Sequence, residues 1–279
     1  MKAAGSRAGA SGAVALHALL VAGGLLTIAP LAWMIAASFM AAGESNAFPP
    51  PLWPKRPTLE HYVALFTRLD LARSFLNSAI VTIAATVGSV IINSLAGYTF
   101  AKLRFRGRDP LFRGLTLALV VPAQVGMLPL FLLLRELGLV NTYVGAIIPY
   151  LASVFGIFLV RQYALGVPDE LLDSARLDGA SEWRIFRTVV VPVISPILVT
   201  LATFTFLSAW NDFLWPLIVL TDGAKYTLPV AIANLSGEHV QDTELMMAGA
   251  VTTVLPAVLV FLVFQRSYVR GILAGSVKG

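Results

Sequence analysis

Long apolar stretches alternate with shorter polar segments along the whole chain. These stretches are continuously hydrophobic, whereas the strands of a membrane β-barrel alternate over segments of about ten residues. A helix that crosses the hydrocarbon core of a bilayer needs about 20 apolar residues. The pattern therefore predicts an all-α, polytopic membrane protein with six spans, at about Val14–Met40, Ser74–Phe100, Leu115–Leu134, Val144–Val160, Val193–Leu220 and Leu245–Phe264.

Composition supports the membrane assignment. Hydrophobic residues make up 57% of the 279 residues, and charged residues only 13%. Soluble domains are about 25% charged, so this chain has too little charge to cover a water-facing surface. An ordinary soluble enzyme and a disordered chain are both excluded on these grounds.

The chain offers little for catalysis. It has no cysteine, and its three histidines are scattered, so neither a metal site nor a catalytic triad is expected. None of the five lysines follows a glycine, so the phosphate-binding pattern G-x-x-x-x-G-K-[ST] is absent from the sequence. We therefore expect no catalytic residue and no bound cofactor on this chain.

The basic residues predict the orientation. If the N-terminus is cytoplasmic, the inner segments carry 14 of the 20 lysines and arginines, and the densest cluster runs from Lys102 to Arg113. Because cytoplasmic segments are enriched in lysine and arginine, both termini are predicted to be cytoplasmic. The +5 net charge therefore suggests topology anchors rather than a nucleic-acid partner.

Two long outer segments follow from this orientation. In residues 41–73, Thr58 is expected to cap a short amphipathic helix after a proline-rich run. Residues 221–244 are polar and acidic.

The inner segment 161–193 carries helix signals of its own. Pro168 and Asp169 favour a helix start, Gly179 favours a left-handed helix end, and Ser181 favours a second helix start. Pro192 is expected to mark the entry to the fifth span. The pattern predicts two helices on the cytoplasmic face, either as a docking element or as a solvated connector, and we favour docking.

Within this segment, the run from Glu170 to Pro192 resembles the EAA loop of ABC-importer permeases. Asp173-Ser174-Ala175 stands where that family has E-A-A, and both Gly179 and Pro192 fit its pattern. Further resemblances to sugar-importer permeases occur along the chain, at Thr58–Tyr62, Asn77-Ser78, Gly97-Tyr98, Asn141–Tyr143, Trp210–Phe213 and Arg270–Gly279. The sequence is similar to the second permease subunit of carbohydrate importers, the MalG- and UgpE-like group.

The resemblance implies that residues 1–279 form one transmembrane domain with the type I ABC-importer permease fold. It implies a homologous second permease, two copies of a cytoplasmic ATPase that bind ATP and Mg²⁺, and an external solute-binding protein toward which residues 221–244 reach. The implied location is the plasma membrane of a bacterium or archaeon, and the implied solute is a sugar or a sugar-like molecule such as glycerol phosphate. The residues that would contact the ATPase are Glu170, Asp173, Ala175, Asp178, Gly179, Pro192, Lys278 and Gly279.

Asp212 is the acidic residue placed well inside a predicted span, and polar residues in a membrane are often functional. Trp210, Asn211 and Asp212 are therefore candidates for the substrate pathway, with a structural role in helix packing as the alternative. Two alternative functions would require other sequence features. An ion-driven secondary transporter would be expected to show internal repeats and several buried ionisable groups, and a membrane scaffold would not need the docking pattern.

Overall fold

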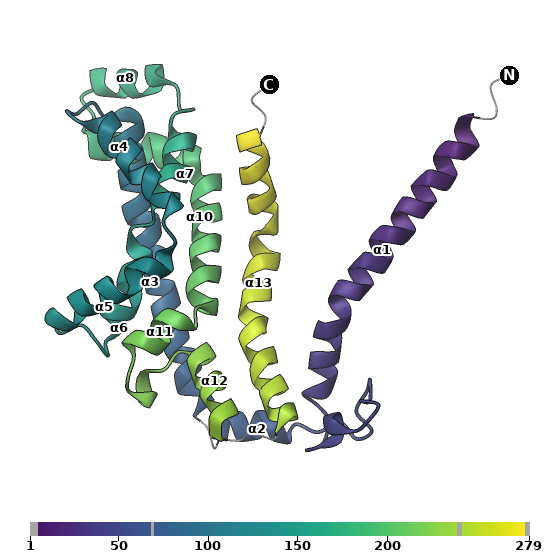
Figure 1. Ribbon diagram of the computed structural model, residues 1–279. Coiled ribbons are helices and arrows are strands. Elements are labelled where there is room, and N and C mark those ends of the chain that lie inside the picture. Colours follow the sequence, from purple (N-terminus) through teal and green to yellow (C-terminus); the bar gives the residue numbers. More distant parts are fainter. Residues whose placement is uncertain (1–4, 68–69, 239–241, 277–279) are drawn as a thin grey trace. The chain divides into compact units, whose positions relative to one another are not determined.

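The computed structural model describes residues 5–67, 70–238 and 242–276, and the regular elements of these residues are all helical (Figure 1). The α-helices are α1 Gly5–Ala37, α2 Glu60–Thr67, α3 Leu71–Lys102, α4 Arg108–Leu117, α5 Met127–Glu136, α6 Tyr143–Leu151, α7 Val154–Ala164, α8 Asp169–Leu177, α9 Glu182–Ile185, α10 Val191–Asn211, α11 Leu214–Val219, α12 Leu228–Glu238 and α13 Thr243–Ser276. Short 3₁₀ turns lie at Glu44–Asn46, Ala118–Val120, Ala123–Gly126 and Gly223–Lys225, and a π-helical turn lies at Phe186–Val190.

The described residues form two compact units. The first lies within Met1–Asp70 and Asn234–Thr252, and the second within Leu71–Ala233 and Thr253–Gly279. The second unit contains the segment that resembles the EAA loop.

In the first unit, α2 packs against the segment that follows α1. The His61 imidazole Nε2 lies 2.9 Å from the Met40 carbonyl oxygen, and the hydroxyls of Ser38 and Tyr62 are 2.8 Å apart. The backbone N–H of Ser45 donates to the buried Glu244 carboxylate at 2.7 Å. The predicted short helix is confirmed, but it begins one residue later than a cap at Thr58 requires: Leu59 accepts the first intrahelical bond, and the Thr58 hydroxyl accepts from the Glu60 N–H at 3.2 Å.

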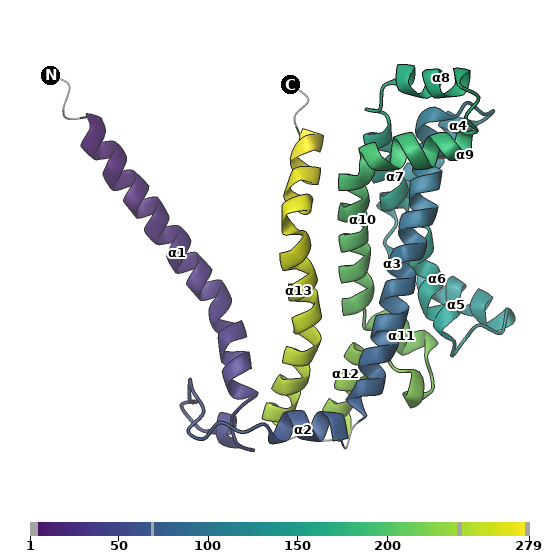
Figure 2. The ribbon, with the colours of Figure 1, turned by 180° about the vertical axis from the view of Figure 1, so that it is seen from behind.

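Helix α3 is the centre of the second unit. It packs against α6, α7 and α10, as both views show (Figures 1 and 2). Glycine permits one close approach, because a Cβ atom added to Gly97 would lie only 2.6 Å from the Val160 Cβ atom on α7. Small residues at such positions let two helix backbones come close together.

Asn93 on α3 explains why one predicted span is broken. Its amide nitrogen donates to the Leu151 carbonyl at 3.2 Å, and its amide oxygen accepts from the Ser153 N–H at 2.9 Å. These are backbone groups at the junction of α6 and α7, where the chain bends by 41°. The buried amide therefore satisfies polar groups that a continuous helix would pair internally.

The predicted spans are thus helical, as expected, but some of them are broken rather than continuous helices. Four described helices are long and apolar enough to cross a membrane, or up to six spans if each bent helix pair counts as one. The third predicted span is divided by a 102° bend between Val120 and Ala123, because Val121 is extended before Pro122. The fifth predicted helix ends at Asn211 rather than at Leu220.

Candidate functional site

Helix α8 begins and ends where its sequence signals predict. Asp169 is its first residue and follows Pro168. Leu172 is buried, whereas Leu177 at the far end is 90% exposed. The helix therefore lies with one edge against the second unit and its other residues open to solvent.

The turn after α8 has the left-handed geometry expected of a glycine. Gly179 has a φ of +78°, and a Cβ atom built there would meet nothing within 4 Å. The N–H groups of Gly179 and Ala180 close the helix by donating to the carbonyls of Arg176 and Ala175, each at 3.0 Å. The predicted glycine helix end is confirmed.

Ser181 caps the second helix as predicted. Its hydroxyl accepts a hydrogen bond from the Arg184 N–H at 3.4 Å. Pro192 is the second residue of α10, and the helical stretch Glu182–Asn211 continues through it, so no helix end separates the inner segment from the fifth predicted span. The π-helical turn Phe186–Val190 lies just ahead of Pro192, and a local π-turn rearranges the backbone pairing where proline cannot donate.

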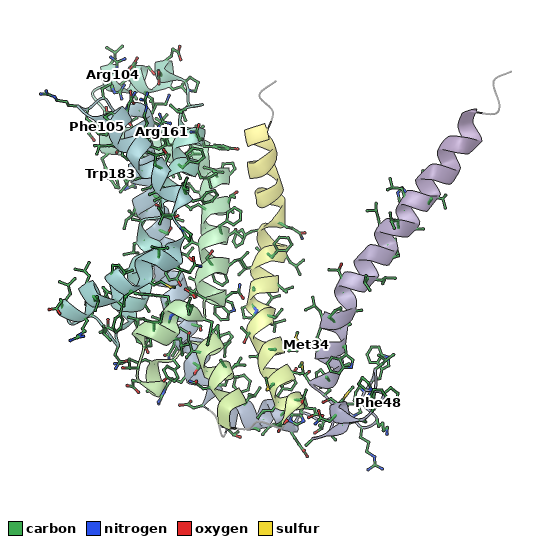
Figure 3. The ribbon with its side chains drawn as sticks, in the orientation of Figure 1. Met34, Phe48, Arg104, Phe105, Arg161 and Trp183 are labelled. Carbon is green, nitrogen blue, oxygen red and sulfur yellow. The ribbon has the colours of Figure 1, made fainter. Side chains whose placement is uncertain are left out.

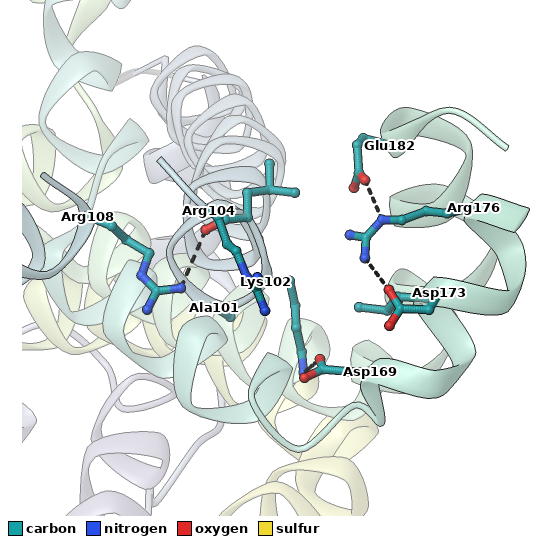
Figure 4. Close-up of a pocket in the computed structure, with 10 residues that line it drawn as sticks. Ala101, Lys102, Arg104, Arg108, Asp169, Asp173, Arg176 and Glu182 are labelled. Carbon is teal, nitrogen blue, oxygen red and sulfur yellow. Dashed lines mark hydrogen bonds and ion pairs between the residues drawn. The ribbon is translucent and has the colours of Figure 1, made fainter. Parts of the chain in front are cut away.

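Ion pairs connect α8 to its neighbours on one side of a cleft (Figure 4). The Arg176 guanidinium lies between two carboxylates, with Nε 2.8 Å from Glu182 Oε1 and Nη1 2.8 Å from Asp173 Oδ1. The Tyr98 hydroxyl on α3 donates to Glu182 Oε2 at 2.6 Å. The hydrogen bond to Glu182 is the main reason that the pKa of Arg176 is raised above its ordinary value.

A second ion pair holds the start of α8. Lys102, at the end of α3, places its Nζ 2.6 Å from Asp169 Oδ1 and 2.6 Å from the Val167 carbonyl oxygen. The hydrogen bond from Lys102 lowers the pKa of Asp169 below its ordinary value, so this carboxylate is charged near neutral pH. The two ion-paired groups and the arginines of the α3–α4 connection surround a cleft of about 810 Å³, lined by Ala101, Lys102, Leu103, Arg104, Arg108, Asp169, Leu172, Asp173, Arg176 and Glu182.

Aromatic and basic side chains gather at this end of the second unit. Figure 3 shows Arg104, Phe105, Arg161 and Trp183 there. The Arg161 guanidinium carbon lies 3.9 Å from the centre of the Phe112 ring, and its Nε donates to the Phe100 carbonyl at 3.2 Å. These contacts fix α7 to the end of α3 and to α4.

The structure brings most of the predicted coupling residues together. Glu170, Asp173, Asp178 and Gly179 are exposed on α8 and the turn that follows it, and Ala175 is partly buried beside them. Pro192 is exposed on a different helix, α10. Lys278 and Gly279 lie outside the described residues.

Sequence reasoning missed the groups that hold α8 in place. In the sequence alone, Lys102 indicates only a topology charge, Tyr98 belongs to a short motif, and Glu182 has no distinguishing feature. These residues matter because of contacts between distant parts of the chain. Lys102 and Asp169 are separated by 67 residues, and Tyr98 and Glu182 by 84 residues. The available signal was the spacing of Tyr98 and Lys102, which places both on one face of a helix four residues apart.

The candidate pathway residues lie at a helix break. Asp212 is the C-cap of α10, with an extended backbone, and its Oδ1 accepts from the N–H of Leu214 at 2.9 Å and of Trp215 at 3.3 Å. Its other carboxylate oxygen accepts from the Tyr150 hydroxyl on α6. Asp212 therefore ends one helix and starts the next, and the expectation that it lies inside a continuous span is wrong.

Trp210 and Asn211 differ in exposure. The Trp210 side chain is buried, its indole N–H donates to the Thr253 carbonyl at 2.8 Å, and its ring stacks on Phe206 at 5.8 Å. Asn211 is exposed, and its amide nitrogen donates to the Leu207 carbonyl within its own helix. Asn211 is thus the most exposed member of the trio, and Asp212 is partly buried.

At the opposite end of α3, a polar cluster fixes the loop after α11. The Asn77 amide donates to the carbonyls of Ala224 and Tyr226, each at 3.0 Å, and accepts from the Tyr143 hydroxyl at 2.8 Å. The Ser78 hydroxyl accepts from the Leu228 N–H at 2.7 Å. These bonds hold residues 223–228 in a defined conformation.

Comparison with known proteins places these features in context. Residues 93–273 match the family described as "Binding-protein-dependent transport system inner membrane component". The arabinooligosaccharide transport permease AraQ of Halalkalibacterium halodurans is 37% identical over 257 residues, which cover 91% of this chain and 92% of that protein. The lactose transport permease LacG of Rhizobium radiobacter is 32% identical over 94% of this chain and 95% of its own length.

A solved structure is similar as well. It is a chain from a bacterial ABC transporter involved in the import of the acidic polysaccharide alginate. It covers 93% of this chain and 97% of its own length, with a TM-score of 0.82 and 24% sequence identity. At this identity the likeness concerns the fold.

Proposed function

Because this chain belongs to the family of binding-protein-dependent transport system inner membrane components, we propose that it imports sugars or sugar-like solutes such as glycerol phosphate. It is a permease subunit and not an enzyme, and ATP is hydrolysed on a separate subunit. Relatives named for arabinooligosaccharides, lactose and glycerol 3-phosphate support the choice of substrate class.

The proposed machine contains this chain, a homologous second permease, two cytoplasmic ATPases that bind ATP and Mg²⁺, and an external solute-binding protein. The chain would cross the bacterial inner membrane six times, with both termini in the cytoplasm. Counting each bent helix pair as one span gives up to six spans, which supports this topology. ATP-driven closure of the ATPases would then switch the permease pair between inward- and outward-facing states.

The observation that carries the coupling role is the exposed surface of α8 and its turn. Glu170, Asp173 and Asp178 offer three carboxylates to solvent, while Leu172 anchors the helix from beneath. A helix that is held on one edge and charged on the other suits insertion into a partner subunit. We include Ala175, Gly179 and Pro192 in this surface, with Lys278 and Gly279 of the C-terminal tail.

For the substrate pathway, we propose that Asn211 contacts the solute, while Trp210 and Asp212 hold the helix break that presents it. The exposed amide of Asn211 can donate to and accept from sugar hydroxyls. Its exposure, and the hydrogen bonds that Trp210 and Asp212 make to other helices, support this division.

The coupling proposal is tested with two matched Asp-Gly pairs. The first variant is Asp178→Arg with Gly179→Pro, at the turn after α8. The control is Asp222→Arg with Gly223→Pro, at the 3₁₀ turn after α11. Both variants should insert into membranes to the same level as the wild-type chain.

We expect the Asp178 and Gly179 variant to lose ATPase co-purification and solute uptake, because proline cannot adopt the positive φ of Gly179 and arginine reverses a surface charge. The control should retain ATPase co-purification. Equal retention of the ATPase by both variants would contradict the coupling role of α8. The solute class is tested by competition of uptake with arabinooligosaccharides, lactose and glycerol 3-phosphate.

A further inference from the structure

Two side chains on the last turns of α3 reach toward α8 from the same helix face. Tyr98 and Lys102 are four residues apart, which places them one above the other. Tyr98 connects to the end of α8 and Lys102 to its start. Helix α8 is therefore attached at both ends to a helix that is distant in sequence. Figure 2 shows α8 and α9 at the same end of α3 as α4.

The first attachment passes through Glu182. One oxygen of this carboxylate accepts from the Tyr98 hydroxyl, and the other accepts from Arg176, which in turn contacts Asp173. Tyr98 is 3% exposed, and its ring packs against Phe186 at 5.4 Å. Packing holds Tyr98 in place. Because Glu182 bonds both to Tyr98 and to Arg176, it holds the end of α8 at a fixed position relative to α3.

The second attachment uses all the donor capacity of Lys102. Its ammonium group donates to the Asp169 carboxylate, to the Val167 carbonyl and, at 3.4 Å, to the Leu165 carbonyl. Its side chain is only 6% exposed, in contrast to 74% for Asp169. An ammonium has three donors, so Lys102 holds both the backbone that leads into α8 and the first residue of the helix.

Helix α3 is well placed to pass on a displacement of α8. It packs against α6, α7 and α10, whereas α8 continues in sequence only into α7 and α9. If α8 were joined to the rest of the chain by its flanking loops alone, dihedral changes in those loops would absorb a movement of α8. Attachment at two further points removes that freedom.

We propose that Glu182 and Lys102 are positioning residues that make α3 the lever between α8 and the membrane helices. This inference rests on the proposed coupling role of α8. It adds that the movement reaches the membrane helices through the noncovalent contacts of α3, with Tyr98 and Arg176 as the partners of Glu182. Loss of these contacts leaves the ATPase bound but separates ATP hydrolysis from transport.

The test uses the assembled importer in liposomes, with the binding protein and solute present, and measures solute transported per ATP hydrolysed. Glu182→Gln keeps the shape of the side chain and removes its charge. A charged hydrogen bond affects an equilibrium by about tenfold, and we expect the ratio to fall by about that factor while ATPase co-purification is unchanged. Tyr98→Phe should lower the ratio by a smaller factor.

The double variant provides the decisive comparison. If Tyr98 acts through Glu182, then Tyr98→Phe combined with Glu182→Gln should lower the ratio no further than Glu182→Gln alone. Tyr163→Phe is the matched control, because Tyr163 is a partly buried tyrosine on α7 whose hydroxyl has no hydrogen bond among the described residues. Its ratio should equal that of the wild-type importer.

Three results would overturn the lever proposal. They are an unchanged ratio in Glu182→Gln, fully additive losses in the double variant, or loss of ATPase co-purification in both single variants. If Glu182→Gln does not insert, Tyr98→Phe decides alone. A wild-type importer that shows no ATPase co-purification would instead contradict the proposed function on which this inference rests.

Discussion

The turn after α8 and the break at Asp212 both interrupt helices, but they are held in different ways. At the turn, the chain's own neighbouring residues supply the geometry, with Gly179 at positive φ and Ser181 as the next cap. At the break, Asp212 caps α11 locally but also binds Tyr150, which is 62 residues away in sequence. The first interruption is encoded locally, whereas the second depends on the assembled helices.

This difference predicts that the Asp212 site is the more sensitive of the two. In Asp212→Lys, an ammonium that cannot accept hydrogen bonds replaces a carboxylate that accepts three. Unmet polar groups cost about 1–3 kcal/mol each, so we expect a stability loss of at least about 3 kcal/mol and no transport. Thermal unfolding in detergent and uptake measure the two effects.

Asp212→Asn is the matched variant for that site. An amide oxygen can still accept from the N–H groups of Leu214 and Trp215, as asparagine does at many helix starts. We therefore expect it to retain most of the stability and measurable uptake. Equal transport by the asparagine and lysine variants would show that the break does not depend on the Asp212 contacts.

The turn after α8 should tolerate change better. Gly179→Ala forces a Cβ-bearing residue into the left-handed region, at a cost of about 1–2 kcal/mol. Since a Cβ atom there meets open space, no packing penalty is added. The expected result is a modest loss of ATPase co-purification without a change in membrane insertion. A loss of stability as large as in Asp212→Lys would contradict the local origin of this turn.

The same contrast explains what the sequence could predict. The membrane class, the family and the caps of α8 and α9 depend on composition or on signals a few residues apart, and the structure bears out the two caps at Gly179 and Ser181. Pro122 and Pro149 indicate bent helices, but neither shows that the bend at Pro122 reaches 102° or that Asn93 satisfies the break between α6 and α7. An apolar run has the same appearance whether its helix is straight or broken, and only the groups that satisfy the freed backbone distinguish the two.

The contacts of Lys102, Tyr98 and Glu182, on which the proposed positioning role rests, could not be predicted for a related reason. Charge counting assigns a basic residue near a span to topology, and this rule contains no information about partners. The contacts that give Lys102 and Tyr98 their positions join α3 to residues 165–182. Such pairings are decided by tertiary packing rather than by local pattern.

A smaller effect is expected at the Ser181 cap. Replacement of a capping serine by alanine costs about 1 kcal/mol, and the Ser181 hydroxyl makes one long hydrogen bond of 3.4 Å. Ser181→Ala should therefore slightly increase amide hydrogen exchange in residues 182–185 and leave uptake almost unchanged. Exchange that spreads into α10 would indicate that the turn is less self-contained than its local bonds suggest.

The smallest effect is expected where an exposed partner is removed. Asp169→Asn deletes a carboxylate whose side chain is 74% exposed, and exposed ion pairs are strongly screened by water and salt. Lys102 keeps its bonds to the Val167 and Leu165 carbonyls in this variant, whereas Lys102→Ala loses all three contacts. The transport ratio should therefore be close to that of the wild type in Asp169→Asn and clearly lower in Lys102→Ala.

The pH dependence of the same pair follows from the sign of the shift. The pKa of Asp169 is lower in the folded protein than its ordinary value, mainly because of Lys102. Its contribution is therefore fully present above the ordinary aspartate pKa and is lost only as the pH falls through the lower, folded value. The amount of solute transported per ATP hydrolysed should differ between the Asp169→Asn and wild-type importers by the same factor at every pH between about 6 and 8. A divergence in that range would mean that the pKa of Asp169 is raised rather than lowered, and the attachment at the start of α8 would then rest on the two backbone carbonyls alone.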